Sequence, residues 1–405
     1  MTRTEHLIER LGHHGDGIAA GPVFVPLTLP GEQVSGVVER DRLGDLRVLT
    51  PSDQRVKAPC AHFKSCGGCG LQHASDAFVA GWKVDVVRQA LAAVGLEAAF
   101  RPIKTSPAQS RRRAVISARR TKKGAMAGFH MRASSVICEV QSCEVLDPDL
   151  MRAVEIAKEL AILGASRKGE LSVTATLSEG GLDIAVTGGR ALDGAFEAQL
   201  GQEAQRLNVA RLTWEGEVIA SVQPAVQRFG GAAVVPPPGA FLQATREGEA
   251  ALLSAVQEIV GEARRVVDLF AGCGTFALPL AQHAEVHALE GEAAMMAALD
   301  RGWRGAQGLK KVSTETRDLF RNPVMAEDLR YDAAVIDPPR AGAQAQTAEL
   351  AASSVARIAF VSCNPVTFAR DAKLLVDAGY RLDWVQVVDQ FRWSSHVELV
   401  GAFLR

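Results

Sequence analysis

Cys363 stands where the sequence predicts the end of a buried strand. The run 357–363 is apolar and rich in β-branched residues, and Asn364-Pro365 interrupts it at once. In open α/β folds, ligands bind and chemistry occurs at this carboxyl edge of the sheet. Taken alone, a cysteine in such a place is more often a small buried side chain than a nucleophile. The remaining sequence must therefore decide between the two interpretations.

A second group of cysteines has the spacing of metal ligands. Cys60, Cys66 and Cys69 follow the pattern Cys-x5-Cys-x2-Cys, with glycines and polar residues between them, which favours thiolate ligation over unligated core cysteines. A fourth ligand is needed, and either Cys138 or Cys143 could supply it. Zinc and an iron–sulfur cluster both accept four thiolates. Three clustered ligands with one distant ligand favour a [4Fe–4S] cluster, because zinc sites prefer two separated cysteine pairs.

A third set of polar residues lies where strands end in the C-terminal part of the chain. Residues 268–274 read Asp-Leu-Phe-Ala-Gly-Cys-Gly, a glycine-rich turn that lets the backbone approach a ligand closely. The next strand ends in Glu290, whose carboxylate can accept hydrogen bonds from both hydroxyls of a ribose. Asp318 closes the third strand, and Asp337-Pro-Pro closes the fourth. This is the pattern of class I S-adenosylmethionine-dependent methyltransferases, and it predicts a Rossmann-like α/β domain. An NAD-binding fold would leave Asp-Pro-Pro and the strand-end thiol unexplained.

In that setting the thiol has a specific use. Asp337 and Cys363 end successive predicted strands of one parallel sheet, so both should face the pocket of the methyl donor. C5 of a pyrimidine is a poor nucleophile, but a thiolate that adds to C6 makes C5 enolate-like, and C5 can then attack the methyl group. A base must afterwards remove the C5 proton, and His396-Val-Glu398 supplies an imidazole and a carboxylate. Shielding from water would give Glu398 the raised pKa that a base needs.

The stretch from Arg101 to Arg132 carries one sign of charge. It contains ten Lys or Arg and no Asp or Glu. Residues 113–119 alternate like a strand and residues 120–124 read as its turn, so the charges should lie on a folded hairpin. Such a surface is typical of phosphate contacts, which makes RNA the expected partner. The candidate RNA-binding residues are Arg111, Arg112, Arg113, Arg119, Lys122, Lys123 and Arg132.

The chain of 405 residues is long enough for two or three domains. Residues 1–55 alternate short β-prone runs with glycine-rich turns, which predicts a small β-barrel. Residues 56–235 read as an α+β domain that holds the cysteine group and the basic hairpin. Pro236-Pro-Pro-Gly239 then marks the boundary to the α/β domain, residues 236–405.

Composition narrows the class of protein. No apolar run approaches the about 18 residues of a membrane span, and the first residues lack the apolar core of a signal peptide. We therefore expect a cytoplasmic protein without a membrane partner, acting as a monomer. The net charge of −1 by itself favours no polyanionic partner. Seven cysteines without an export signal favour metal binding or catalysis over disulfides.

Over nearly its whole length the sequence resembles the RNA uracil-5-methyltransferase family, and in particular its iron–sulfur members with a TRAM domain, an OB-like RNA-binding barrel, that modify 23S rRNA. The motifs that carry the resemblance include the cysteine group with Cys143, Asp337-Pro-Pro-Arg340, Ser362-Cys-Asn-Pro365 and residues 389–398. The resemblance implies Cys363 as nucleophile, Glu398 as proton acceptor and Cys143 as the fourth cluster ligand. It also implies S-adenosylmethionine as cofactor, bound by Gln243, Phe270, Thr275, Glu290, Asp318 and Asp337.

Two departures from the family pattern concern the pocket. Thr275 stands where relatives often have Asn, and residues 391–395 replace the usual Phe-Pro-x-Thr segment. Arg340 follows the Pro-Pro motif where cytosine-5 enzymes carry a cysteine, which favours uridine as the target. The alternatives are uridine-5 methylation of tRNA, cytosine-5 methylation of RNA, and an iron–sulfur RNA-binding protein without catalysis.

Overall fold

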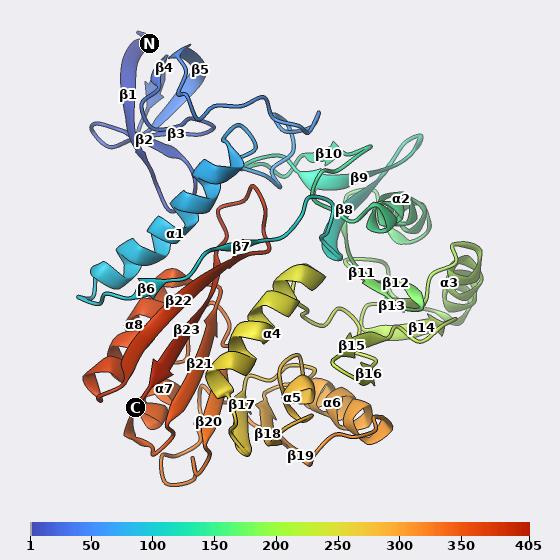
Figure 1. The fold of residues 1–405 in the computed structure, drawn as a ribbon. Coiled ribbons are helices and arrows are strands. Elements are labelled where there is room, and N and C mark those ends of the chain that lie inside the picture. The colour runs from blue at the N-terminus through green and yellow to red at the C-terminus, as the bar shows by residue number, and fades with distance from the viewer. Residues whose placement is uncertain (1) are drawn as a thin grey trace.

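The computed structural model describes residues 2–405 and contains three larger β-sheets and one two-stranded sheet (Figure 1). A barrel lies at the N-terminal end, a seven-stranded sheet in the middle of the chain and a nine-stranded sheet at the C-terminal end. None of the helices in residues 2–405 combines the length and the apolar character that crossing a membrane requires.

Five strands close the N-terminal barrel in the order β1-β2-β3-β5-β4. Its interior is filled by aliphatic side chains such as Ile8, Val25 and Val34. Strand β4 passes so close to β5 that a Cβ at Gly36 would lie 2.5 Å from the carbonyl oxygen of Gly44. The predicted barrel is confirmed. Its strands are β1 Thr4–Leu11, β2 Gly17–Ala19, β3 Val23–Val25, β4 Gln33–Glu39 and β5 Arg42–Thr50.

The central sheet has the order β10-β9-β8-β11-β12-β13-β14 and shares one core with two helices. Trp214, wholly buried, meets Phe196 edge to face in this core. The predicted basic hairpin is present as β8 and β9. The elements are β8 Arg113–Thr121, β9 Gly124–His130, β10 Ile137–Glu139, the short η1 Pro148–Met151, α2 Arg152–Gly164, β11 Leu171–Ser178, β12 Gly181–Thr187, α3 Gly194–Arg206, β13 Arg211–Trp214 and β14 Glu217–Ser221.

The C-terminal sheet has the order β19-β18-β17-β20-β21-β23-β22-β6, with β7 beside β22. Its first five strands are parallel, and β23 inserts antiparallel between β21 and β22. This topology brings the carboxyl ends of β17, β18, β20 and β21 to one edge. The strands are β17 Arg265–Leu269, β18 Glu285–Glu290, β19 Val312–Thr316, β20 Ala333–Ile336, β21 Arg357–Ser362, β22 Arg381–Asp389 and β23 Glu398–Leu404.

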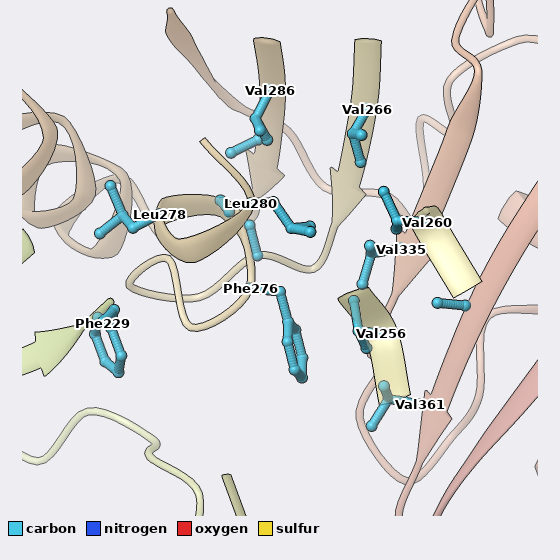
Figure 2. Packing of buried hydrophobic residues seen from close by; sticks show 14 of the residues in the cluster. Phe229, Val256, Val260, Val266, Phe276, Leu278, Leu280, Val286, Val335 and Val361 are labelled. Atoms are coloured by element: carbon cyan, nitrogen blue, oxygen red, sulfur yellow. The ribbon is translucent and has the colours of Figure 1, made fainter. Parts of the chain in front are cut away.

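Helices cover both faces of this sheet. One face packs against α4 Arg246–Val260, the single-turn α5 Ala277–Leu280 and α6 Ala293–Gly305. Figure 2 shows part of that core, where valines of α4, β17 and β21 gather around Phe276. The other face packs against α7 Gln344–Ala352, α8 Pro365–Asp377 and α1 Asp76–Ala92. The sequence predicts a longer helix over 276–284, but the chain must turn there to enter β18 at Glu285.

Two segments assigned by sequence to residues 56–235 pack on the C-terminal sheet. Helix α1 contributes Val87 and Leu91 to the same core as α7 and α8, and β6 Ala99–Phe100 and β7 Lys104–Thr105 pair with β22. The hairpin of β15 Gln227–Phe229 and β16 Ala232–Val234 also joins the C-terminal core. Two-residue strands carry no readable periodicity, and an apolar stripe shows that a helix is buried without showing against which sheet. The C-terminal core therefore also includes side chains from segments that precede Pro236.

Candidate active site

Cys363 is half-buried at the end of β21, directly before helix α8. Asn364 caps that helix, because its side-chain oxygen accepts a hydrogen bond from the Val366 N–H at 3.1 Å, and Pro365 occupies the first helical position. The Asn364 amide also donates to the carbonyl of Arg340 at 2.9 Å, which ties the Asp-Pro-Pro-Arg loop to the cysteine loop. The strand-to-helix turn thus fixes where the thiol points.

Glu398 begins β23, the strand that pairs antiparallel with β21. Ser362 is paired with Leu399, so the next residues in each direction, Cys363 and Glu398, leave the sheet at the same edge. Glu398 is 3% exposed, and its carboxylate accepts a hydrogen bond from Gln390 at 3.3 Å. The predicted nucleophile and the predicted base therefore lie on neighbouring strands.

Gln390 links the predicted base to the predicted cofactor residues. Its Nε2 donates to the side-chain oxygen of Gln243 at 2.6 Å as well as to Glu398, and its own oxygen accepts from the Ala244 N–H at 2.8 Å. Gln243 in turn donates to Asp337 at 3.3 Å. A continuous chain of hydrogen bonds therefore connects Glu398, Gln390, Gln243 and Asp337. Gln390 lies within the 389–398 motif, but the motif alone predicts no role for it. Its three hydrogen-bond partners become visible only in the folded structure.

Buried carboxyl groups raise one another's pKa in this site. Burial and then the neighbouring Asp337 raise the pKa of Glu398 well above its usual range, whereas the Gln390 amide and Arg340 oppose the shift. Burial also raises the pKa of Asp337 to about 7. Burial, Asp337 and Glu290 hold the pKa of Asp268 well above normal. A cation bound among these groups would favour their ionised forms.

Asp268 was not predicted as a site residue. It is fully buried in β17; the backbone N–H of Ala277 acts to lower its pKa, but neither carboxylate oxygen has a hydrogen-bond partner of normal geometry within residues 2–405. Buried polar atoms are normally paired, so the orphaned carboxylate indicates a ligand-facing role. Its position as the first residue of the Asp-Leu-Phe-Ala-Gly-Cys-Gly motif was the signal that could have found it.

The glycine-rich turn after β17 has the open geometry that the sequence predicts. Gly272 has φ +55° and open space where a Cβ would lie, and its N–H donates to Glu290 at 3.1 Å. Glu290 is fixed on its other side by the N–H of Gly291 at 2.7 Å. Phe270 enters the turn with φ +64°, a strained conformation for a non-glycine residue. Thr275 is half-buried on the same turn.

Asp318 is exposed in the loop after β19, where it accepts a hydrogen bond from the Phe320 N–H at 3.0 Å. That bond turns Phe320 toward Phe270, and the two ring centroids lie 5.4 Å apart. Phe320 is 49% exposed, so one side of this aromatic pair stays open. Phe320 was missed by the sequence analysis because a single aromatic residue in a loop has no pattern.

Cys363 opens into a cleft of about 770 Å³ that three parts of the chain line. The barrel contributes His13 and His14, helix α1 contributes Phe78 and Trp82, and the catalytic edge contributes the thiol. Burial, followed by the carboxylates of Glu398 and Asp337, raises the pKa of the Cys363 thiol to about 11, and Arg340 acts in the opposite direction. The cleft is large enough for a nucleotide to reach the thiol.

The loop at residues 389–397 closes one side of the cleft and is held from the N-terminal half of the chain. Lys83 of α1 donates to Asp389, and Asp76 of α1 accepts hydrogen bonds from Arg392 and from the indole of Trp393. The Trp393 carbonyl accepts the N–H groups of Gly70 and Leu71, both at 2.9 Å. These partners lie in the segment that follows the cysteine group.

His396, in the same loop, faces the cleft beside Arg340. The Arg340 guanidinium lies 2.8 Å from Nδ1 of His396. Burial, then Arg340 and Lys83, lower the pKa of His396. A neutral imidazole can accept a hydrogen bond from Arg340 but is a weaker base than the buried carboxylate, so the geometry favours Glu398 as the proton acceptor.

The four cysteines of the predicted ligand set line one cavity of about 270 Å³. The sulfur of Cys66 accepts the Gly68 N–H at 3.4 Å, and the sulfur of Cys143 accepts the Val145 N–H at 3.4 Å. The remaining candidate, Cys138, donates to Ser65 and does not line the cavity. Within residues 2–405, no three His, Cys, Asp or Glu side chains lie close enough together to hold a metal ion. Burial raises the pKa of Cys69 to about 12.

The predicted RNA-binding residues fall into two groups. Arg112 is 4% exposed and binds Glu249 and the Gln243 carbonyl, Arg113 donates to the Gly239 carbonyl, and Arg111 borders the cysteine cavity. These contacts favour a structural role over the predicted phosphate contact. Arg119 is half-buried beside Glu170. The exposed cations are Lys122, Lys123 and Arg132, none of which has an acidic partner within residues 2–405.

Comparisons with known proteins agree with this geometry. Residues 304–405 match the family described as tRNA (Uracil-5-)-methyltransferase. An uncharacterized RNA methyltransferase of Brucella suis is 43% identical over 98% of this chain and 97% of its own length. The 23S rRNA (uracil(1939)-C(5))-methyltransferase RlmD of Thiobacillus denitrificans is 32% identical over 98% of each chain.

Among solved structures, the tRNA (uracil-54, C5)-methyltransferase of Pyrococcus abyssi in complex with S-adenosyl-L-homocysteine superimposes with a TM-score of 0.74. The superposition covers 99% of both chains at 22% identity, so it shows that the whole fold is shared, including the N-terminal barrel.

Proposed function

Since this chain belongs to the RNA uracil-5-methyltransferase family and its activity is S-adenosylmethionine-dependent methylation of RNA uracil, we propose that its target is C5 of one uridine in 23S rRNA. The observation that carries the mechanism is the placement of Cys363 and Glu398 on neighbouring strands, at one edge of the sheet and around one set of buried carboxyl groups. A thiol and a shielded carboxylate in this arrangement serve C5 methylation and have no use in methylation of an amine.

The residues around the glycine turn fit S-adenosylmethionine, which when bound supplies an electrophilic methyl group. Glu290 would hold the ribose hydroxyls, and Phe270 with Phe320 would flank the adenine beside Asp318. The orphaned carboxylate of Asp268, with Asp337 near it, would hold the positively charged end of the molecule. The side-chain amide of Gln243 donates to Asp337 at 3.3 Å. Thr275, in the turn, completes the proposed set.

Cys363 opens the reaction by adding to C6 of the uracil ring. The thiol first releases its proton to solvent in the cleft, because burial and the nearby carboxylates raise the pKa of Cys363 to about 11, and the positive charge of Arg340 stabilises the thiolate that remains. After C5 has received the methyl group, Glu398 takes the C5 proton, the electron pair re-forms the C5–C6 double bond, and the C6–S bond breaks. Burial gives Glu398 the high pKa that a proton acceptor at neutral pH needs.

The choice of 23S rRNA over tRNA rests on the relative from Thiobacillus denitrificans, which is matched over 98% of its length. The tRNA alternative is favoured by the name of the matched family and of the solved structure. Unmodified 23S rRNA and unmodified tRNA, each incubated with labelled methyl donor, separate the two. We expect label in the uridine C5 methyl of 23S rRNA. Label in tRNA alone would reassign the target, and label in cytosine would overturn the uridine assignment.

A [4Fe–4S] cluster held by Cys60, Cys66, Cys69 and Cys143 is the second part of the proposal. The support is that these four thiols border one cavity, that backbone N–H groups already point at two of the sulfurs, and that the Arg111 guanidinium lies beside them. When bound, the cluster would cross-link the segment at 60–69 to the loop at 143. Anaerobic purification should give a brown protein with about four irons per chain. One zinc ion per chain in place of iron would show that the four cysteines form a zinc site.

The barrel and the exposed hairpin cations are proposed to bind RNA. The barrel resembles a TRAM domain, and its residues His13 and His14 line the cleft that leads to Cys363. Lys122, Lys123 and Arg132 add positive charge on the neighbouring central domain, where phosphate contacts would position the RNA.

A further inference from the structure

Helix α1 buries a charged residue on its apolar face. Lys83 lies among Val79, Trp82 and Val87, and its side chain is 0% exposed. Its ammonium group donates to Asp389 at 2.6 Å and to the carbonyl of Phe391 at 3.0 Å. Asp389 is 2% exposed, so both charges of this ion pair are removed from water. A well-packed apolar pair would dock the helix equally well, which leaves the purpose of the charges to be explained.

The ion pair fixes the two residues on either side of Gln390. Asp389 accepts a hydrogen bond from the Phe391 N–H at 3.1 Å in addition to the one from Lys83. Lys83 therefore holds the side chain before Gln390 and the carbonyl after it. The Gln390 side chain, 1% exposed, is the group that donates to Glu398 and to Gln243. A shift of this short segment would move the amide that orients the carboxylate.

We propose that Lys83 is a positioning residue for proton abstraction: through Asp389 and Gln390 it holds Glu398 in the orientation that removes the C5 proton. The inference rests on the proposed roles of Cys363 and Glu398. Cys363 itself is held by β21, Asn364 and the Arg340 loop, and none of these contacts passes through Lys83. Loss of Lys83 should therefore slow the step after methyl transfer and spare the steps before it.

Two RNA substrates separate these steps. On RNA with 5-fluorouridine at the target, thiol addition and methyl transfer proceed, but the fluorine at C5 cannot be removed, so a covalent complex accumulates. Its rate of formation reports every step before proton abstraction. On ordinary uridine, the turnover rate also includes proton abstraction and release. The ratio of the two rates isolates the step assigned to Glu398.

For Lys83→Met we expect complex formation within about 3-fold of the unaltered protein and turnover lowered about 10-fold or more, because general base catalysis commonly contributes 10²–10⁴-fold. Covalent complex should accumulate on ordinary uridine RNA, with little change in KM for the RNA. The variant leaves Asp389 buried without its charged partner, so its Tm should also fall. Lys83→Met/Asp389→Leu removes both charges and should recover much of the Tm without recovering turnover.

Val87→Ala is the matched control, since Val87 is fully buried one turn further along the same helix and its aliphatic side chain cannot hydrogen-bond to Asp389 or Phe391. It should lower the Tm and leave the ratio of the two rates unchanged. Three results would overturn the proposal: both rates falling together in Lys83→Met, neither rate changing, or turnover returning with Tm in the double variant. Failure of the proposed function itself would look different, because the unaltered protein would then form neither 5-methyluridine nor the covalent complex.

Discussion

The molecule contains two cysteine environments, and their difference separates the proposed nucleophile from the proposed ligand set. Cys363 stands alone at the end of a central strand with Glu398 and Asp337 close by, and these carboxylates add to the rise in its pKa. The four cysteines of the second cavity lie on loops of the central domain. There the groups that face the sulfurs are backbone N–H donors and the Arg111 guanidinium. Burial raises the pKa of thiols in both places, to about 11 at Cys363 and to about 12 at Cys69. The difference lies in the neighbouring groups: carboxylates raise the pKa further at Cys363, whereas N–H donors and a cation beside the other four cysteines favour anionic sulfur.

The two environments are also connected. The Trp393 carbonyl, in the loop that precedes Glu398, accepts hydrogen bonds from Gly70 and Leu71, directly after Cys69. Arg111, which borders the cysteine cavity, lies with its guanidinium 5.7 Å from the ring centroid of Phe391 in the same loop. The segment that carries the proposed ligand set therefore contacts the loop that precedes Glu398.

The largest expected effect comes from removing the nucleophile. Cys363→Ala should abolish methylation and the covalent complex with 5-fluorouridine RNA, because the proposed addition to C6 requires the thiolate. Its Tm should stay close to that of the unaltered protein, since the side chain is only half-buried. Denaturing gel electrophoresis of the enzyme–RNA mixture measures the complex. A complex that persists in this variant would assign the nucleophile to another residue.

The next effect comes from neutralising the base. Glu398→Gln should still form the covalent complex, because the Glu398 carboxylate raises the pKa of Cys363 and is not needed for addition. Turnover should fall by about 10²-fold or more, with complex accumulating on ordinary uridine RNA. Rapid-quench measurement of complex decay checks this. Decay as fast as in the unaltered protein would exclude Glu398 as the proton acceptor.

Substitutions in the proposed ligand set should affect iron content and Tm first and turnover only indirectly. Cys143→Ser should lose most of the bound iron and lower the Tm, with turnover reduced as a consequence of a loosened catalytic loop. Cys138→Ser is the matched control, because Cys138 is a neighbouring thiol that binds Ser65 outside the cavity. It should retain iron and turnover. Metal analysis and thermal melts check both variants, and equal iron loss in the two would place Cys138 in the ligand set.

The sequence predicted most of what lies at strand ends and little of what connects distant segments. Cys363, Asp337 and Glu290 follow from strand patterns that end in breakers or acids, and the structure places all three at one sheet edge. Lys83 could not be predicted, because its partner Asp389 lies 306 positions away and a lysine on a helix normally points to solvent.

The run Arg111-Arg112-Arg113 is a second case in which local sequence does not predict a contact with a distant segment. Three consecutive arginines in a basic stretch indicate a phosphate-binding surface, but Arg112 is buried against Glu249, 137 positions later in the chain. Local sequence reveals charge and periodicity. It does not reveal which charges fold against each other, and that pairing separates the buried arginines from the exposed lysines of the hairpin.

The buried acids of the catalytic pocket predict a pH effect on stability that the cysteine cavity does not share. The pKa of Asp337 is raised to about 7 in the folded chain, against about 3.9 when unfolded. The folded state therefore binds more protons between these values, and stability falls as the pH rises through this window. Asp337→Asn keeps the shape and cannot ionise. Without methyl donor, its Tm should match the unaltered protein near pH 4 and exceed it increasingly toward pH 7. A gap that shrinks with rising pH would contradict the assignment.

The smallest effect concerns RNA affinity and separates the exposed lysines from the buried arginines. Lys122→Ala/Lys123→Ala removes two exposed charges that have no acidic partner within residues 2–405, so the folded protein loses no internal contact. Each phosphate contact contributes about 0.7–0.9 to the slope of log K against log salt. The variant should bind RNA more weakly at low salt, with the slope reduced by up to about 2.

Arg112→Ala should instead lower the Tm, because it leaves Glu249 buried without its partner, and should keep the salt slope. Filter binding between about 50 and 200 mM salt, the range over which such contacts respond strongly, measures both slopes. An unchanged slope in the lysine variant would remove the hairpin tip from the RNA-binding surface and leave the barrel to position the RNA.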